Sequence, residues 1–341
     1  MSFSLSRQQT PASRLKDRVQ RHLQFFLLDV LRTGPIPQHV AFIMDGNRRY
    51  ARSKNISTVE GYILGGVVFT QIVNTCFLYG IKAVTVYAFS IENFKRPKAE
   101  VDALMGLAVH NMSTIIEQIS QQGHGTKVQI LGRLDLFSES VQQSVGRLVE
   151  RTSHHTETIV NFCVGYTARE EITTAMRRTV ADCTLASTDT SSSNSSSSSS
   201  SSSSTASTSS DSISVNSLSE NMYTAGCPPL DMIIRTSGER RLSDFLLWQS
   251  IHDNSEFVVV RCFWPEFGFL QLFWVMIGWQ RRQSRIGKRD YHSSSKGGGP
   301  LCSDGETLQS LLVGRTGIWR IALLLLIMCL ILGLLMLNKS I

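Results

Sequence analysis

A polar motif at residues 45–49 follows directly on a run of mostly apolar residues, 39–44. It consists of Asp45, Gly46, Asn47, Arg48 and Arg49. A glycine lets the backbone approach a ligand closely, while amide and guanidinium groups donate hydrogen bonds to an anion. Taken alone, an Asp-Gly pair is also typical of a plain turn, so an anion-binding function needs support from other segments.

Three other segments carry similar side chains beside apolar runs. The first has Ser90, Glu92, Asn93 and Arg96, the second has Arg235, Ser237, Gly238, Glu239, Arg241 and Ser243, and the third begins at Glu256. Arginines with small hydroxyls and a few carboxylates suit diphosphate groups together with a hard divalent cation. The second segment could be a solvated loop, but several such segments in one chain make chance a poor explanation. Neither a Walker loop nor a dinucleotide-binding fingerprint occurs in the sequence.

The polar segments accompany predicted strands. Runs rich in Val, Ile and Phe predict strands at 39–44, 83–89, 127–131, 158–164, 230–234 and 256–263. Helical periodicity lies between them and is clearest from Val101 to Ile119. This alternation predicts an α/β fold with a mostly parallel central sheet, which binds its ligand at the carboxyl ends of the strands.

Composition narrows the possible partners and compartment. The formal net charge of +7 over 341 residues favours anionic partners: phosphorylated small molecules, a membrane surface or nucleic acid. Seven cysteines without a C-x-x-C pair indicate reduced thiols in a cytosol-facing protein, and argue against a disulfide framework or a zinc site.

A Ser/Thr tract at about 187–212 interrupts the globular pattern and includes ten consecutive serines from Ser195. Because the tract has no apolar surface to offset the entropy of ordering, we expect a disordered surface insertion. An inert insertion is favoured over a phosphorylated regulatory loop.

Segments near both ends of the chain have the pattern of membrane-binding or surface-lying helices. Residues 321–337 are apolar without a charge, which favours a tail anchor that spans a thin bilayer such as that of the endoplasmic reticulum. Arg315 and Arg320 before this segment, against Lys339 after it, favour a catalytic domain on the cytosolic side. Apolar residues at helical spacing within 1–33 predict an amphipathic helix, which could lie on the domain or on a membrane surface.

Five segments resemble, in order, the signature blocks of the cis-prenyltransferase family. They are HVAFIMDGNRRYAR, VTVYAFSIENFKRP, NFCVGYTAREEI, IIRTSGERRLSDFLLWQ and FWPEF. The likeness is greatest to eukaryotic dehydrodolichyl diphosphate synthases. It implies repeated condensation of isopentenyl diphosphate onto an allylic starter such as farnesyl diphosphate, each new double bond being cis. It also implies a parallel sheet ringed by helices, with a hydrophobic tunnel for the growing chain.

The resemblance also implies roles for particular residues. Asp45 is expected to be catalytic and to bind magnesium, and Ser90 and Asn93 to act near the proton removed from the incoming unit. The residues expected to bind substrate diphosphates are Gly46, Asn47, Arg48, Arg49, Arg96, Arg235, Arg241 and Ser243. Tyr166, Arg169 and Glu171 match a block expected to be structural, and Glu239 is expected to support the residues that touch substrate.

Glu256 is the second expected magnesium ligand. Bacterial members of the family place a metal-binding glutamate eight residues before the tryptophan of the W-P-[DE] block, and counting back from Trp264 reaches Glu256. Counting forward from Trp248 reaches Asn254 instead. We prefer the backward count, because a strand register is harder to shift than the preceding loop.

The basic run at residues 279–290 bears on assembly. Arg285 and Gly287 fit the R-x-G motif with which homodimeric members complete the neighbouring active site. In heteromeric members that motif sits on a separate, catalytically silent subunit. Asp45 and R-x-G on one chain therefore favour a homodimer, although the run could instead be a basic surface attracted to anionic lipid.

Two departures from the family pattern bear on rate or substrate positioning, and two alternative functions stay open. Tyr62 stands where the family usually has histidine, and Arg133 where it has aspartate. One alternative is a non-catalytic or heteromeric subunit of a dehydrodolichyl diphosphate synthase complex, against which the complete set of motif residues argues. The other is a membrane-anchored phospholipid- or nucleic-acid-binding protein. We expect no nucleic-acid partner, since no signature for one is evident.

The predicted organisation of the chain follows from these segments. It consists of an N-terminal amphipathic helix region at 1–33, a catalytic domain at 34–290, a linker at 291–317 and a transmembrane anchor at 318–338.

Overall fold

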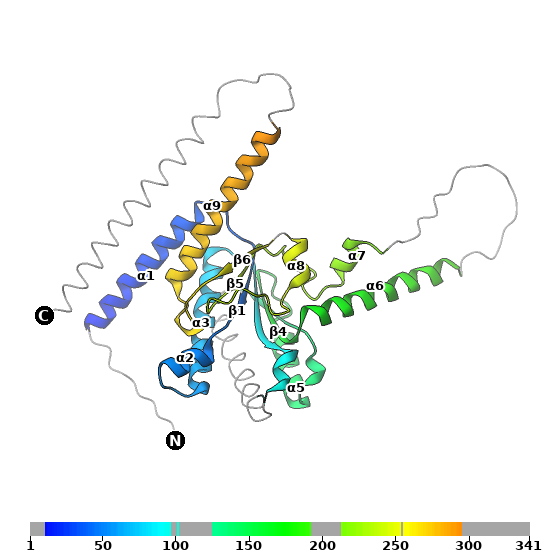
Figure 1. Ribbon diagram of the computed structural model, residues 1–341, viewed down its shortest axis with the longest axis horizontal. Helices are drawn as coiled ribbons and strands as arrows, with labels where there is room; N and C mark the ends of the chain where they lie inside the picture. The colour runs from blue at the N-terminus through cyan, green and yellow to red at the C-terminus, as the bar shows by residue number, and fades with distance from the viewer. Residues whose placement is uncertain (1–10, 97–100, 102–124, 192–212, 254, 295–341) are drawn as a thin grey trace. The chain divides into compact units, whose positions relative to one another are not determined.

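The computed structural model describes residues 11–96, 101, 125–191, 213–253 and 255–294 (Figure 1). The chain divides into two compact units, Met1–Ser284 and Arg285–Ile341, and the sheet and the site described below belong to the first. The predicted helix around 101–119, residues 192–212 of the Ser/Thr tract, and the predicted linker and anchor beyond 294 lie outside the described residues, apart from Val101.

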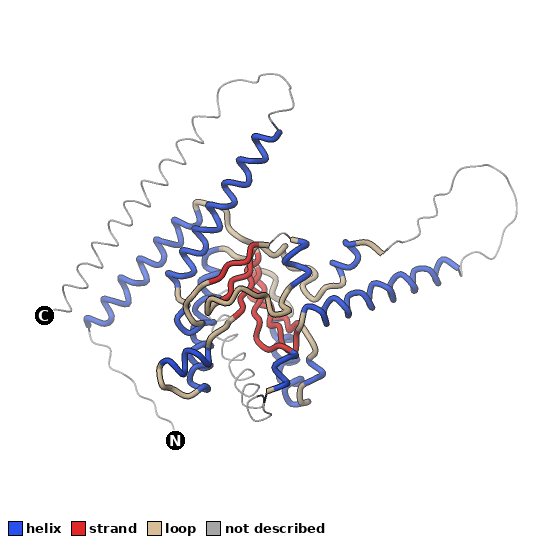
Figure 2. Tube along the Cα trace, in the orientation of Figure 1, coloured by secondary structure: helices blue, strands red, loops and turns tan. Residues whose placement is uncertain are grey.

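A six-stranded parallel sheet forms the centre of the first unit, with the strand order β3-β4-β2-β1-β5-β6. Figure 2 shows the strands in red and the helices in blue. The strands are β1 (His39–Ile43), β2 (Ala83–Ser90), β3 (Thr126–Leu131), β4 (Thr158–Tyr166), β5 (Met232–Arg235) and β6 (Glu256–Val259). All five residues of β1 are buried, as expected for a central strand covered on both faces. The predicted α/β fold with a parallel sheet is confirmed.

The last strand is shorter than the sequence predicts. The apolar run extends to residue 263, but β6 ends at Val259. Beyond it, the carbonyl groups of Val260 and Cys262 accept hydrogen bonds from Gly238 (2.9 Å) and Ser237 (2.8 Å). Residues 260–262 therefore pack against the loop after β5. That loop lies at the edge of the sheet where the site forms.

Helices surround the sheet. The α-helices in the described residues are α1 (Pro11–Arg32), α2 (Asn47–Ser53), α3 (Thr58–Tyr79), α5 (Glu139–Thr152), α6 (Ala168–Ser191), α7 (Val215–Glu220), α8 (Leu247–His252) and α9 (Phe269–Ser294). The same part of the chain also forms the 3₁₀ helices η1 (Ile91–Lys95), η2 (Leu134–Leu136) and η3 (Trp264–Glu266). α6 continues to Ser191, so the predicted insertion does not begin at 187: its first residues prolong a helix.

Helix α3 is sharply delimited by its ends. Ser57 and Glu60 form a reciprocal capping box at its start, and Gly80 ends it with a φ of 111°, a conformation that glycine adopts without strain. Among the described residues, α3 alone is long and apolar enough to cross a membrane, but 50% of its most apolar window is buried inside the protein. A core helix passes the same test.

Helix α1 confirms an amphipathic N-terminal helix and shows that one of its faces lies on the domain. Leu27, Leu28 and Leu31 are buried, and α1 contacts α3. Gln280 of α9 donates a hydrogen bond to the carbonyl of Leu31 at 2.7 Å. Phe25 remains 52% exposed, so contact of the other face with a membrane stays a prediction.

A buried histidine in β1 predicts a pH-dependent stability. His39 is 1% exposed, its Nδ1 lies 2.9 Å from the Pro228 carbonyl, and its Nε2 lies 2.7 Å from the Thr85 hydroxyl. Burial lowers the pKa of His39 to about 4, although the Pro228 carbonyl opposes the shift. The unfolded chain binds this proton near pH 6.5, so the free energy of unfolding should fall as the pH drops from about 6.5 to 4, by up to about 3 kcal/mol.

Urea denaturation at pH 7 and at pH 4.5 measures this effect. His39→Gln should flatten the pH dependence, whereas the exposed His154→Gln is the matched control for loss of a histidine. An unchanged pH slope in His39→Gln would contradict the prediction.

Candidate active site

A cavity of about 980 Å³ opens at the carboxyl ends of the central strands. Eleven of the predicted site residues line it: Asp45, Gly46, Asn47, Arg48, Arg49, Ser90, Asn93, Arg96, Arg235, Arg241 and Ser243. They come from segments far apart in the sequence, and the parallel sheet brings them together because the strands end at one edge.

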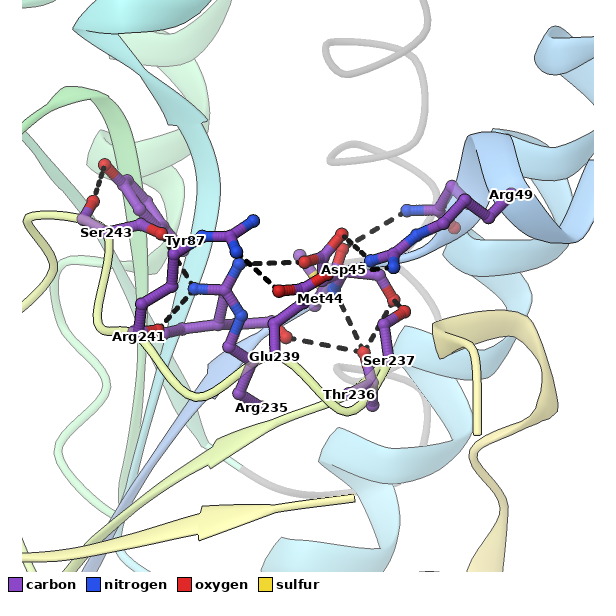
Figure 3. A network of polar contacts seen from close by, with 12 residues as sticks. Met44, Asp45, Arg49, Tyr87, Arg235, Thr236, Ser237, Glu239, Arg241 and Ser243 are labelled. Carbon is purple, nitrogen blue, oxygen red and sulfur yellow. Dashed lines mark hydrogen bonds and ion pairs between the residues drawn. The ribbon is translucent and has the colours of Figure 1, made fainter. Parts of the chain in front are cut away.

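Asp45 lies at the centre of the polar contacts in this cavity (Figure 3). Its Oδ2 accepts a hydrogen bond from Nη2 of Arg235 at 2.8 Å, and its Oδ1 lies 3.2 Å from Nη2 of Arg49. The Thr236 and Ser237 hydroxyls donate to its backbone carbonyl at 2.7 and 2.9 Å. The carboxylate of Asp45 is therefore held by the last residue of β5 and by α2, and its backbone by the loop after β5.

The charges around Asp45 determine its ionisation. Burial opposes the charged form, but the hydrogen bond and charge of Arg235, with those of Arg49, outweigh burial and hold the pKa of Asp45 below its ordinary value. Asp45 is therefore a carboxylate throughout the neutral range, as a metal ligand or an electrostatic partner must be.

Glu239 links two of the arginines predicted to bind substrate. Its Oε1 lies 3.1 Å from Nη1 of Arg49, and its Oε2 pairs with Nη1 of Arg241. Arg235, which is 4% exposed, also donates to the Arg241 carbonyl and, at 2.8 Å, to the Ser243 hydroxyl. Two carboxylates thus hold three guanidinium groups in one connected network.

Gly46 meets a strict steric requirement. Its φ is 104°, and a Cβ placed there would lie 2.1 Å from Oγ of Ser237. Only glycine allows the chain to turn from β1 into α2 with the loop after β5 packed against it. The turn places Asn47, Arg48 and Arg49 in the first turn of α2, beside Asp45.

Ser90 and Asn93 lie together at the end of β2. The Ser90 backbone N–H donates to Oδ1 of Asn93 at 3.1 Å, and the Ser90 hydroxyl accepts from the Glu92 backbone N–H at 3.2 Å. This capping box fixes η1 and holds both side chains at the cavity. Arg96 follows at once and donates to the Tyr62 hydroxyl at 3.4 Å.

Part of the cavity lining is apolar. It is formed by Ile43, Phe69, Phe89, Phe162, Val164 and Trp264. The rings of Phe69 and Phe162 pack in a tilted arrangement, with centroids 5.5 Å apart. The site therefore combines a cationic rim with a wall that fits hydrocarbon.

The structure does not bring Glu256 to Asp45. The parallel register pairs Glu256 with Met232, whereas Val259 pairs with Arg235 at the level of the site. Glu256 thus lies three residues, about 10 Å, along the strand toward the opposite edge of the sheet. Its Oε1 pairs with Arg282, and it does not line the cavity. Within this chain the two predicted magnesium ligands are therefore apart. Glu256 is the first residue of β6, whereas Asp45 follows the last residue of β1.

Arg285 and Gly287 fall in the last part of α9. Their side-chain surroundings lie outside what the structure describes, and they belong to the unit that is not placed relative to the cavity. Their predicted role at a neighbouring site stays a prediction.

The cavity residues absent from those predicted to bind substrate or act in catalysis include Tyr62, Tyr87, Glu239 and Asp244. Glu239 and Asp244 lie in the loop after β5. An acidic residue among the arginines of this segment was the sequence feature that could have indicated them. Tyr62 stood out only as a departure from the family pattern. Tyr87 gave no signal: its hydroxyl donates to the Ser243 carbonyl at 3.3 Å, a contact between distant segments.

The residues present fit a magnesium ion that arrives with its substrate. The described part of the chain contains no group of three or more His, Cys, Asp or Glu side chains arranged around a metal position. Magnesium, however, commonly binds one or two carboxylates together with substrate phosphates and water. Asp45, ionised and at the cavity, supplies such a ligand.

The chain is similar to known proteins in sequence and in structure. The family model for undecaprenyl diphosphate synthase prenyltransferases matches residues 43–287. A human dehydrodolichyl diphosphate synthase complex subunit is 37% identical over 273 residues, covering 80% of this chain and 75% of the relative. An isoprenyl transferase of Thermus thermophilus is 35% identical over 262 residues, covering 77% and 93%.

Solved structures share the fold. The lavandulyl diphosphate synthase from Lavandula x intermedia, in complex with dimethylallyl diphosphate, has a TM-score of 0.60 and 25% identity, covering 72% of this chain and 95% of that one. An undecaprenyl diphosphate synthase from Campylobacter jejuni has a TM-score of 0.54 at 21% identity, which shows the fold alone.

Proposed function

Because the chain belongs to the undecaprenyl diphosphate synthase family of cis-prenyltransferases, we propose that it elongates an allylic diphosphate with isopentenyl diphosphate. The starter is farnesyl diphosphate, and the product is a long-chain polyprenyl (dehydrodolichyl) diphosphate for dolichol synthesis and protein glycosylation. The observation that carries the proposal is Asp45, held as a carboxylate between Arg235 and Arg49 at the rim of a cavity with an apolar wall.

The proposed reaction breaks the allylic C–O bond and forms a C–C bond to isopentenyl diphosphate. Diphosphate leaves with the electron pair of the C–O bond, and a proton leaves the incoming unit as its double bond shifts. The allylic diphosphate is held by Gly46, Asn47, Arg48 and Arg49. Their hydrogen-bond donors stabilise the negative charge that develops on the departing diphosphate. In this proposal Ser90 and Asn93 act near the proton that leaves the incoming unit, and Arg96 adds positive charge beside them.

The second diphosphate, that of isopentenyl diphosphate, is assigned to the end of β5 and the loop after it. Arg235, Arg241 and Ser243 hold isopentenyl diphosphate, because guanidinium forks fix the orientation of a phosphate as well as neutralising it. Arg235 pairs with Asp45 and Arg241 pairs with Glu239. A bound diphosphate would therefore compete with these carboxylates for the same guanidinium groups. The apolar wall holds the growing hydrocarbon.

Magnesium is the proposed cofactor. Asp45 and the substrate diphosphate would hold it, and it would neutralise the departing diphosphate when bound. Glu256 is not part of this proposal for a single chain, because it lies toward the other edge of the sheet.

A product assay tests the proposed function. Purified full-length chain in detergent is incubated with farnesyl diphosphate, labelled isopentenyl diphosphate and Mg²⁺, and the products are sized after phosphatase treatment. We expect polyprenyl products that disappear with EDTA. If isopentenyl diphosphate binds but no chain grows, the proposed activity is wrong.

A heteromeric subunit is the second candidate. The human and fission yeast relatives are each named as a subunit of a dehydrodolichyl diphosphate synthase complex. The chain's own Arg285 and Gly287 favour a homodimer that needs no other subunit. Activity of the purified chain alone would distinguish the two.

Mixing two inactive variants tests the homodimer. If Arg285 completes the partner's site, a mixed dimer of Asp45→Ala and Arg285→Ala chains has one site with both lesions and one intact site. Half of randomly mixed dimers are of this kind, so activity should recover to about a quarter of wild type if the sites act independently. Each variant alone is the control. Proven subunit exchange without recovery would mean that Arg285 serves its own chain or a membrane surface.

The proposed location is the endoplasmic reticulum membrane, with a C-terminal anchor and the catalytic domain facing the cytosol. Removing residues from Ile318 onward should give a chain that no longer fractionates with membranes yet still elongates short starters. A control that replaces the apolar segment by an unrelated transmembrane segment should restore the membrane fraction. Equal membrane association of the shortened chain would assign anchoring to α1.

A further inference from the structure

We propose that Asp244 is a positioning residue for the isopentenyl diphosphate site, acting by docking the loop after β5 onto the start of α6. This inference rests on the proposed function, because it assumes that Arg235 and Ser243 hold that diphosphate. Asp244 itself acts through these neighbours.

The backbone of this loop has an unusual conformation. Ser243, Asp244 and Leu246 have φ values of 54°, 62° and 45°, in the left-handed region that residues other than glycine seldom adopt. Such a conformation persists only when surrounding contacts hold it in place. Three instances within four residues indicate that this loop is shaped by what it touches.

The contacts that hold the loop come from one short segment, residues 166–169. The carboxylate of Asp244 accepts hydrogen bonds from the backbone N–H of Arg169 at 3.1 Å and from its Nε at 2.7 Å. The carbonyl of Asp244 accepts from the N–H of Ala168 at 2.8 Å. Two residues on, the N–H of Leu246 donates to the hydroxyl of Tyr166 at 3.3 Å.

Docking Asp244 sets the position of its neighbour Ser243. The Ser243 hydroxyl accepts a hydrogen bond from Nη1 of Arg235 at 2.8 Å, and its carbonyl accepts from Tyr87 at 3.3 Å. Arg235 in turn reaches Asp45 at 2.8 Å. The chain of contacts therefore runs from the start of α6, through Asp244 and Ser243, to the arginine at the centre of the site. Figure 3 shows Ser243, Arg235 and Asp45 of this chain.

The backbone contact should matter more than the ion pair. The side chain of Arg169 is 75% exposed, so its charge is screened by solvent, whereas the Asp244 side chain is 14% exposed. Asn in place of Asp can still accept from the Arg169 N–H and tolerates the left-handed region. The contact is also an ordinary helix-end interaction, so an effect on stability alone would not demonstrate positioning.

Four variants of the full-length chain in detergent test the inference: Asp244→Ala, Asp244→Asn, Asp244→Gly and Arg169→Ala. The measurements are kcat, the KM of each substrate, and the Kd of isopentenyl diphosphate by calorimetry. Asp244→Ala should raise the KM and Kd of isopentenyl diphosphate about tenfold, with the KM of farnesyl diphosphate within about twofold. Asp244→Asn and Arg169→Ala should stay within about threefold of wild type.

The glycine variant separates contact from backbone strain. Glycine adopts a φ near 62° freely but has no carboxylate, so Asp244→Gly should impair isopentenyl diphosphate binding as much as Asp244→Ala. Normal binding in Asp244→Gly would overturn the inference, as would equal increases in both KM values or a fall in melting temperature alone. If the wild-type chain binds isopentenyl diphosphate without forming product, the proposed function fails, and the Kd comparison still decides the role of Asp244.

Discussion

Asp45→Ala should lower kcat for prenyl transfer by at least about a hundredfold while the chain still folds. The carboxylate forms ion pairs with both Arg235 and Arg49, at 2.8 and 3.2 Å. Its lowered pKa keeps it charged at neutral pH, available to magnesium and to the arginines. Steady-state kinetics with both substrates saturating would measure the loss.

Controls separate catalysis from folding in this variant. Removing Asp45 leaves the buried Arg235 without its carboxylate, which should cost about 1–3 kcal/mol of stability. Asp45→Asn keeps the shape and removes the charge, so it should be nearly as inactive. Asp135→Ala removes an exposed carboxylate outside the cavity and should leave activity unchanged. Near-normal activity in Asp45→Ala would remove Asp45 from the proposed mechanism.

Arg235→Ala should weaken isopentenyl diphosphate binding by about a hundredfold. The guanidinium contacts Asp45, Ser243 and the Arg241 carbonyl at once, and it is 4% exposed. Its loss therefore removes the charge and leaves three groups without their shared donor. Arg235→Lys should recover only part of the affinity, because an ammonium on a flexible stem cannot reach all three partners with the same geometry.

Calorimetric Kd values and the KM of each substrate would measure this effect. Arg240→Ala is the matched control, since Arg240 lies in the same loop, is exposed and does not line the cavity. A KM for isopentenyl diphosphate that is unchanged in Arg235→Ala would assign this diphosphate to other residues. Loss of farnesyl diphosphate binding instead would exchange the two proposed substrate sites.

Much of the fold was predictable because it depends on local patterns. Alternating apolar runs and helical periodicity indicated a parallel sheet, and each of the six predicted strands overlaps an observed one. Strand ends were less accurate: β6 stops at Val259 because residues beyond it bond to the loop at Ser237 and Gly238. That loop is distant in sequence, so no local signal could mark the end.

The sequence by itself determined which residue types follow the strands, and hence the cationic site with Asp45 at its centre. The carboxyl ends of parallel strands lie at one edge of the sheet, so residues 45–49, 90–96 and 235–243 necessarily come together there. Only the tertiary structure decided that Glu239 links Arg49 to Arg241, and that Asp244 docks on α6. It alone placed Glu256 toward the opposite edge of the sheet, apart from Asp45. Residue types and spacing are local properties, whereas these contacts depend on strand register and on the conformation of a loop held by distant segments.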